Sequence, residues 1–422
     1  MLVERWANAA LLSKLTTHRI VSVVGCRQSG KTTLLLNAPL PHAKFQSLDI
    51  QSTFEEARTD PSFFVRRKNP MTLVIDEIQK VPQLIGEIKY NVDRDPTKGQ
   101  YIISGSADYR KLPQANESLS GRAGFVRVRT FSTAEKRGIG PGFLQNLFDH
   151  RLPLSLSLEC DKFQVLSEAI RGGFPEVVAF SDIDSRTSWF VDYISNQVIL
   201  DMRDQWGVRK KNTIHEVLKS AAIFSSREMR KAVLATSFKV AWQTLDTYFS
   251  AIEAMYIVDM VPGWAKKDYD RPGISPKPFM TDSGLMANLL HIYSPDDILN
   301  NNERSQNEGG KLVETWVYNQ LAPEIDLHPA WSIHYFRSRR HEIDFLVTDE
   351  KGHVLGIEVK AGESVASDDF EHLCWMKELM GAENFTGIIL YSGNRIRAGA
   401  QGCFALPMSA MWSDFSQWES IA

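Results

Sequence analysis

The segment Gly25-Cys26-Arg27-Gln28-Ser29-Gly30-Lys31-Thr32 decides the fold. It follows a short apolar stretch at residues 19–24 and precedes a helix-like stretch at residues 31–37. In this setting the pattern G-x-x-x-x-G-K-[ST] is typical of a phosphate-binding loop. Gly25 and Gly30 allow the backbone to curl, so that successive N–H groups point at phosphate oxygens. The sequence therefore predicts a P-loop domain that binds ATP.

The polar residues of the loop have predicted roles in binding ATP and magnesium. Lys31 supplies a positive charge between the β- and γ-phosphates, and Thr32 supplies a hydroxyl ligand to Mg²⁺. The full set of expected nucleotide-binding residues is Gly25, Arg27, Gln28, Ser29, Gly30, Lys31, Thr32 and Thr33.

Two acidic residues, Asp76 and Glu77, end the apolar stretch at residues 73–75. We expect Asp76 to bind the magnesium shell and Glu77 to orient or deprotonate the attacking water. Acidic residues at the end of a strand are often ordinary turn residues. The phosphate loop upstream favours the catalytic interpretation.

Two further residues are candidates for hydrolysis. A short strand at residues 101–103 leads into Ser104-Gly105-Ser106, close to the expected γ-phosphate, and we favour Ser106 over Ser104 as the hydroxyl that holds the water. Arg122 could supply transition-state charge, either within its own chain or to a neighbouring subunit. An ordinary surface arginine is the alternative, and action across subunits would require a homo-oligomer.

Composition limits the class of protein. At 422 residues the chain is expected to form two or three domains, and 43% apolar with 23% charged residues is typical of a globular protein. The net charge of −3 argues against a polyanion covering the whole surface, but it leaves room for a local nucleic-acid groove. The widely spaced cysteines disfavour a zinc cluster or a disulfide framework. Without a signal-peptide layout or a membrane-spanning apolar run, we expect a cytoplasmic protein with no membrane partner.

The pattern of elements changes twice along the chain. Strand-like stretches alternate with helical ones up to a glycine-rich segment at residues 138–142, which predicts a parallel sheet covered on both faces. Residues 163–255 are mostly helical. Within them, a helix opening at residues 225–229, a longer helix through Trp242 and Ile252, and a strand at residues 256–261 are consistent with a winged helix. A helical spacer that merely packs is the alternative.

The last third predicts the order helix, three strands, helix, strand. The expected elements lie at residues 308–321, 332–337, 342–347, 354–360, 368–380 and 386–391.

Acidic and basic residues gather on these strands. Glu358 and Lys360 are two positions apart and share one face of a strand, Asp344 lies on the neighbouring strand, and Glu314 lies on the preceding helix. The three acids could form an oxygen cage for magnesium, with Lys360 steering the hydrolytic water or the scissile phosphate. A structural salt bridge is the alternative. The basic residues 337–340 would neutralise incoming phosphates.

The ordered series of these motifs resembles a large family of bacterial and archaeal AAA-type ATPases whose C-terminal half is a restriction-endonuclease-like domain of unknown function. The resemblance rests on residues 25–34, 73–79, 104–106, 118–122, 172–176, 192–201, 279–284, 314 and 342–360. It implies an AAA-type core, a winged-helix middle and a C-terminal fold of the PD-(D/E)xK type. Asp344, Glu358 and Lys360 would be the nuclease motif, with Glu314 as the helix acid. Cys26 stands where the family often has proline, and we expect little effect.

The expected architecture is therefore α/β, with an AAA-type ATPase domain at residues 1–140, a helical and winged-helix region at 141–270 and a restriction-endonuclease-like domain at 271–422. The leading hypothesis is an ATP-hydrolysing protein that acts on DNA, in which the nucleotide state controls a magnesium-dependent nuclease-like domain. The alternative is a nucleotide-gated regulator that binds DNA or protein through a catalytically inactive nuclease-like fold. That regulator would use the basic residues 209–211. A small-molecule kinase is disfavoured because it leaves the large C-terminal half without a role.

Overall fold

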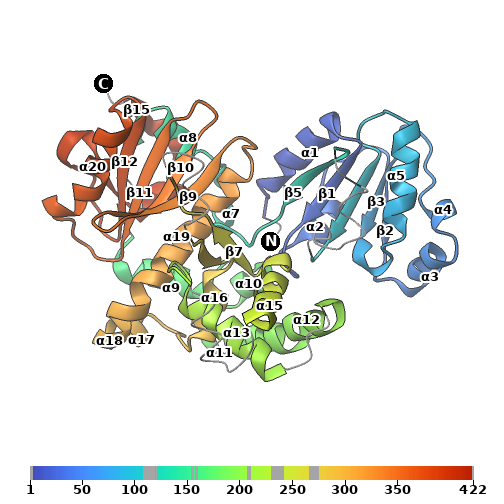
Figure 1. The fold of residues 1–422 in the computed structure, drawn as a ribbon, viewed down its shortest axis with the longest axis horizontal. Helices are drawn as coiled ribbons and strands as arrows, with labels where there is room; N and C mark the ends of the chain where they lie inside the picture. Colours follow the sequence, from blue (N-terminus) through green and yellow to red (C-terminus); the bar gives the residue numbers. More distant parts are fainter. Residues whose placement is uncertain are drawn as a thin grey trace. The chain divides into compact units, whose positions relative to one another are not determined.

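The computed structural model divides into two compact units (Figure 1). Unit 1 comprises residues 1–130 and 254–257, and unit 2 comprises residues 131–253 and 258–422. The structure describes residues 3–107, 119, 121–153, 156, 160–206, 211–229, 242–265 and 275–420. The division at residues 140 and 270 that the sequence suggested stays a prediction.

Unit 1 is built on a five-stranded sheet with the strand order β2-β3-β4-β1-β5. Its strands are β1 (Ile20–Val24), β2 (Ala43–Ser47), β3 (Thr72–Asp76), β4 (Tyr101–Gly105) and β5 (Ala123–Arg127). Every neighbouring pair is parallel, so the predicted parallel sheet is confirmed. β1 lies between β4 and β5 and is buried along its whole length, which explains its unbroken apolar sequence.

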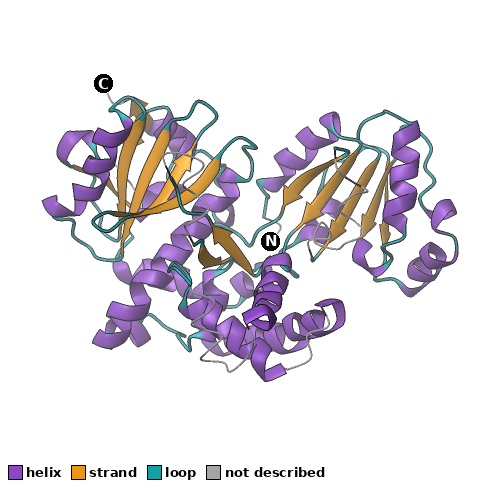
Figure 2. Ribbon diagram, in the orientation of Figure 1, coloured by secondary structure: helices purple, strands orange, loops and turns teal. Residues whose placement is uncertain are grey.

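The helices of unit 1 pack around this sheet (Figure 2). They are α1 (Ala7–Thr17), α2 (Lys31–Asn37), α3 (Gln51–Thr59), α4 (Pro61–Phe64) and α5 (Leu84–Arg94), with a 3-10 turn at Ile78–Lys80. Leu11 of α1 and Leu34 of α2 are packed in one core with Val21, Val74 and Ile102 of the strands. This core fixes the first turn of α2, and with it the phosphate loop, against the end of β1.

The first part of unit 2 is mostly helical, as predicted. Its helices are α7 (Thr133–Lys136), α8 (Phe143–Phe148), α9 (Lys162–Arg171), α10 (Pro175–Ala179), α11 (Ile183–Tyr193), α12 (Ile199–Trp206), α13 (Lys211–Ile223), α15 (Trp242–Ala254), α16 (Ser283–Leu289), α17 (Asp296–Leu299) and α18 (Asn302–Arg304). Two single π-helical turns, Ile194–Val198 and Ser305–Gly309, also occur. Among the described residues, no helix combines the length and the apolar character needed to cross a bilayer.

The predicted winged helix is described only in part. The long second helix is confirmed as α15, and β7 (Val258–Val261) pairs antiparallel with β8 (Lys277–Met280). A helix opening at residues 225–229 is wrong, because residues 224–226 form the turn that follows α13. Ser225 is buried there, where its hydroxyl lies 2.7 Å from the Thr315 hydroxyl and accepts a hydrogen bond from the Met280 N–H at 3.0 Å. Residues 230–241 and the basic positions 209 and 210 lie outside the described residues, so the winged helix stays a prediction.

The second part of unit 2 contains a six-stranded mixed sheet with the order β13-β14-β12-β11-β10-β9. Its elements are α19 (Gly310–Ile325), β9 (Ser332–Arg337), β10 (Glu342–Thr348), β11 (Val354–Lys360), α20 (Glu371–Met380), β12 (Phe385–Tyr391), β13 (Arg397–Ala398) and β14 (Phe404–Pro407). β9, β10 and β11 form an antiparallel meander, and β12 returns parallel to β11 after α20. The predicted order of helix, three strands, helix and strand is confirmed. A final strand, β15 (Trp418–Ser420), pairs with β6 (Arg151–Pro153).

Two glycines, Gly172 and Gly173, follow α9 at a point where backbone segments crowd together. The Phe131 N–H donates to the Gly173 carbonyl at 2.7 Å, and the Gly173 N–H donates to the carboxylate of Asp282 at 2.8 Å. A Cβ atom at Gly173 would lie 2.2 Å from the Phe131 carbonyl oxygen. Because that oxygen belongs to the backbone, it cannot move aside without breaking these contacts.

We expect Gly173→Ala to destabilise the protein by about 1–3 kcal/mol through this overlap. Chemical denaturation followed by circular dichroism measures the change. Gly310→Ala is the matched control, because a Cβ atom at Gly310 meets nothing within 4 Å and alanine is the better helix former. Equal stability of the two variants would contradict the crowding argument.

Candidate functional site

The phosphate loop joins β1 to α2 at the carboxyl edge of the sheet in unit 1. A Cβ atom at Gly25 would lie 2.1 Å from the carbonyl oxygen of Val128, so only glycine allows this approach. The Val128 N–H in turn donates to the Val24 carbonyl at 2.7 Å. Gly30 has a φ of 96°, in the left-handed region that glycine adopts without strain. The two glycines therefore have the backbone roles that the motif predicts.

The ammonium group of Lys31 lies inside the curve of the loop. Its Nζ atom donates to the carbonyl oxygens of Gly25 at 3.0 Å and Cys26 at 2.9 Å. Burial lowers the pKa of Lys31, and the negative charges of Glu77 and Asp76 act in the opposite direction. The arrangement holds one positive charge at a fixed point of the loop.

Asp76, at the end of β3, accepts hydrogen bonds from hydroxyl groups on two other elements. Thr32 Oγ1 donates to Asp76 Oδ2 at 2.8 Å, and Ser104 donates to Asp76 Oδ1. Asp76 is only 1% exposed. Hydroxyl and carboxylate oxygens are the ligands that magnesium prefers, so Thr32 and Asp76 fit the predicted magnesium site. Ser104, which the sequence analysis placed second to Ser106, is the serine that contacts Asp76.

Glu77 is connected to Ser106 through Gln79, a residue that sequence reasoning missed. Gln79 Nε2 donates both to Glu77 Oε2 and to Ser106 Oγ, the latter at 3.2 Å. Glu77 has a left-handed backbone with a φ of 59°, a conformation that costs free energy and is concentrated at functional sites. Burial raises the pKa of Glu77. Gln79 therefore fixes the orientation of the carboxylate that is expected to act on water. Its position two residues after Glu77 is the sequence feature that could have pointed to this role.

Arg5 supports the loop from outside it. Its Nη1 atom donates to the Ser29 carbonyl at 2.9 Å, and its Nη2 atom donates to the Arg129 carbonyl. Nothing in the sequence pattern connects Arg5 with a loop 24 positions away. The side chain is buried, so it braces the loop rather than meeting a ligand.

Not every predicted residue lies at the loop's edge of the sheet. Arg122 pairs with Asp93 at 2.5 Å and lies at the amino end of β5, where its carbonyl accepts from the Ile20 N–H. From Ile20 to Gly25 the chain runs five residues, roughly 16 Å in a strand. Arg122 is therefore not brought to the loop of its own chain, and a role across subunits stays a prediction.

The outer residues of the loop are less constrained. Gln28 and Thr33 are exposed, and Arg27 is half-buried. Contacts of these three side chains with a nucleotide stay predictions.

The second predicted cluster, in unit 2, lies at the carboxyl end of β11, an inner strand of the six-stranded sheet. The Val359 N–H donates to Asp344 Oδ2 at 2.8 Å. Lys360 Nζ lies 3.8 Å from Glu358 Oε2 and 3.1 Å from Asp369 Oδ1. Glu358 is 4% exposed, and its burial, reinforced by the charge of Asp344, raises its pKa to about 8.

A buried lysine, Lys277 of β8, completes this cluster. Its side chain is 2% exposed, and its Nζ atom lies 2.9 Å from Glu342 Oε1 and 4.0 Å from Glu314 Oε1. Burial disfavours the ammonium, but the carboxylates of Glu314, Asp344 and Glu342 outweigh it, so the pKa of Lys277 is raised. Sequence reasoning missed Lys277. A lysine among the residues of a buried strand, 277–280, is the feature that could have indicated a buried charge needing acidic partners.

The magnesium cage expected from Glu314, Asp344 and Glu358 stays a prediction. In the part of the chain that the structure describes, no three carboxylate, histidine or cysteine side chains are placed to hold a metal ion. The Lys277 ammonium acts electrostatically on Glu314 and Asp344, and the Val359 N–H donates to Asp344. Lys277 and Lys360 offset only part of the acidic charge, because burial raises the pKa of Glu314, Asp344 and Glu358.

Removing this cation tests its structural role. We expect Lys277→Met to destabilise the protein by about 3–5 kcal/mol, because buried carboxylates lose their partner. Urea denaturation of the variant measures the loss, and Lys351→Met, at an exposed turn, is the control with the same change of charge. Adding Glu314→Gln to Lys277→Met should recover part of the loss. A Lys277→Met protein as stable as the control would contradict this interpretation.

Comparison with known protein families divides the chain into three parts. Residues 17–136 match a family described as an AAA domain. Residues 164–296 and 309–411 match two families described as domains of unknown function, DUF8612 and DUF4143. Uncharacterized proteins of Mycobacterium bovis and Mycobacterium tuberculosis are each 28% identical over 370 residues, which cover 85% of this chain and 74% of either relative.

Solved structures are similar only at a low level. The Walker-type ATPase PABY2304 of Pyrococcus abyssi is 15% identical with a TM-score of 0.40, covering 67% of this chain and 94% of its own. The RuvB Holliday junction branch migration motor of Thermotoga maritima is 15% identical with a TM-score of 0.28, covering 62% and 90%. The family match and the loop geometry together show that residues 17–136 form an AAA-type P-loop domain with a parallel sheet.

Proposed function

We propose that this chain binds ATP with Mg²⁺ at the phosphate loop and hydrolyses it. The observation that carries the proposal is the convergence of Lys31, Asp76 and Glu77 at the carboxyl edge of the sheet, with Thr32 bonded to Asp76 at 2.8 Å. Ligands of open α/β sheets bind at this edge.

Each side chain has one task in this reaction. Lys31 and the loop amides bind the phosphates, and Thr32 and Asp76 would hold magnesium, which supplies charge neutralisation at the phosphates when bound. Glu77 orients the attacking water and accepts its proton. Gln79 keeps the Glu77 carboxylate in place, and the raised pKa of Glu77 makes it a stronger base than a solvated glutamate.

Two variants separate binding from hydrolysis. We expect Glu77→Gln to keep ATP affinity and to lower the rate of phosphate release by roughly 10²–10⁴-fold, because the proton acceptor is lost. Lys31→Ala should weaken ATP binding itself. A fluorescent-nucleotide titration and a phosphate-release assay measure the two quantities, and Glu56→Gln, on the exposed side of α3, is the control. A wild-type protein with no affinity for adenine or guanine triphosphates plus magnesium would refute the proposal.

We further propose that the nucleotide state controls an action on DNA. An AAA-type domain and a separate mixed-sheet region in one chain support this coupling. Of the two interpretations that the sequence leaves open, the binding regulator is favoured over the magnesium-dependent nuclease. The reason is the ammonium of Lys277, which occupies the acidic cluster that a nuclease would need for metal.

A cleavage assay distinguishes these two interpretations. With linear, circular and single-stranded DNA, magnesium and ATP, we expect no cleavage, and wild type and Lys360→Ala should behave alike. Mobility shifts should instead depend on whether ATP or ADP is present. Cleavage by wild type that Lys360→Ala abolishes would restore the nuclease.

A further inference from the structure

A cavity of about 670 Å³ opens in unit 1 at the amino ends of β2, β3 and β4. Its volume lies within the range of known ligand sites. Met71 lines the cavity just before β3 begins, whereas Asp76 of the candidate magnesium site ends that strand. Five residues of strand separate them by roughly 16 Å. The cavity is therefore distinct from the nucleotide site.

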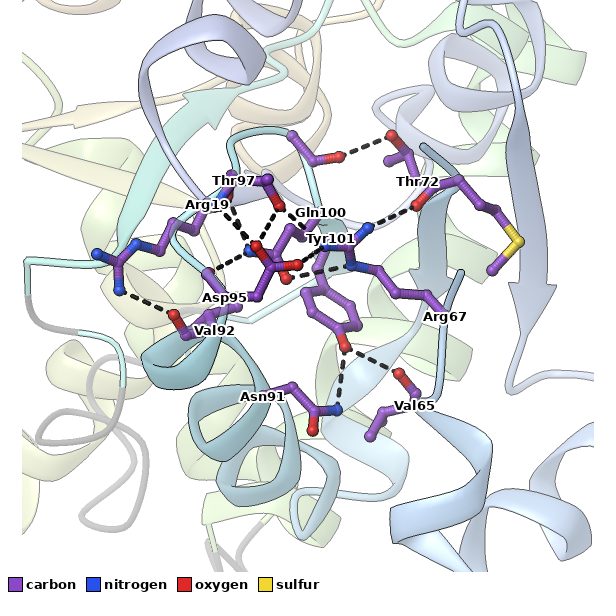
Figure 3. Close-up of polar contacts among 12 residues, drawn as sticks. Arg19, Val65, Arg67, Thr72, Asn91, Val92, Asp95, Thr97, Gln100 and Tyr101 are labelled. Atoms are coloured by element: carbon purple, nitrogen blue, oxygen red, sulfur yellow. Dashed lines mark hydrogen bonds and ion pairs between the residues drawn. The ribbon is translucent and has the colours of Figure 1, made fainter. Parts of the chain in front are cut away.

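The floor of the cavity is a network of hydrogen bonds around Arg67 and Tyr101 (Figure 3). The Arg67 side chain is 7% exposed, and it donates to Asp95 Oδ2 at 2.7 Å and to Gln100 Oε1 at 3.1 Å. The Tyr101 hydroxyl donates to the Val65 carbonyl at 2.8 Å. Such a network holds the floor rigid, and it leaves Arg67 paired with the carboxylate of Asp95.

The rim of the cavity is positively charged. The lining contains the cations Lys44, Arg66, Arg67 and Lys68 and one carboxylate, Asp95. With Arg67 paired to Asp95, three positive charges remain, and the side chains that carry them are all exposed. Three accessible cations around one hollow favour an anionic ligand with several charges.

An exposed aromatic ring lies beside these cations. Phe63 is 57% exposed, whereas its neighbour Phe64 is buried. α4 orients the two rings differently, and the Asp60 carboxylate caps it by accepting from the Phe63 N–H at 2.9 Å. The guanidinium carbon of Arg66 lies 5.6 Å from the centre of the Phe63 ring. A flat ring next to a guanidinium is a surface on which a nucleobase stacks.

We infer that this cavity binds a single strand of nucleic acid. Lys44, Arg66 and Lys68 contact its phosphates, and one base stacks on Phe63. An acidic peptide would satisfy the charges but would leave the ring without a partner. The inference rests on the proposed action on DNA and adds the place where the strand binds.

The test uses the full chain and a fluorescein-labelled single-stranded oligonucleotide, with anisotropy as the readout. The triple variant K44A/R66A/K68A should bind at least tenfold more weakly than wild type. Its plot of log affinity against log salt should be shallower by about 2, since each phosphate contact on a single strand contributes about 0.7. Phe63→Ala should weaken binding by roughly tenfold and leave this slope unchanged.

The control variant K351A/R395A/R397A removes three exposed cations of unit 2 and should bind like wild type. Thermal unfolding midpoints equal to that of wild type show that the variants are folded. Wild-type affinity in the triple variant would overturn this site and leave the action on DNA standing. A wild-type protein that binds neither this oligonucleotide nor duplex DNA would overturn both. Poly-glutamate serves as a second probe. If the triple variant loses poly-glutamate binding but binds the oligonucleotide like wild type, the cavity binds an acidic peptide and the inference is overturned.

Discussion

A buried ammonium group must have oxygen atoms around it, and this requirement shapes both units of the protein. In unit 1, Lys31 obtains carbonyl oxygens because two glycines curl the backbone beneath it. In unit 2, Lys277 obtains carboxylates from α19 and β10. The first ammonium lies inside the curve of the phosphate loop, bonded to two backbone carbonyls. The second is paired with carboxylates of the same chain. The same requirement is therefore met by backbone oxygens in unit 1 and by side-chain oxygens in unit 2.

The sequence predicts the local parts of this structure well. α2, β9 and β11 have the predicted bounds, because a glycine-flanked loop and strands of alternating or continuous apolar character signal themselves within a few residues. The phosphate loop and the acids at the end of β3 were found for the same reason. The turn after α13 was misjudged, since Ser225 resembles a helix start but its hydroxyl serves tertiary contacts with Thr315 and Met280.

Residues whose roles depend on contacts with distant parts of the chain could not be predicted from the sequence. Gln79 acquires its role from Ser106, and Arg5 from Ser29, each more than 20 positions away. Lys277 is the strongest case, because its partner Glu342 lies 65 positions along the chain. The order of elements in unit 2 was predicted correctly, because it follows from local sequence patterns. The Lys277 cation among the acids was not predicted, because it comes from a distant part of the chain.

The brace formed by Arg5 has a practical consequence for work on this protein. Arg5 precedes α1, yet it joins the Ser29 carbonyl to the end of the strand beside the loop. Trimming the chain back to its first helix would look harmless on a secondary-structure diagram. It would remove the hydrogen bonds that Arg5 makes to the Ser29 and Arg129 carbonyls, so a shortened protein without ATP turnover would say nothing about the full chain.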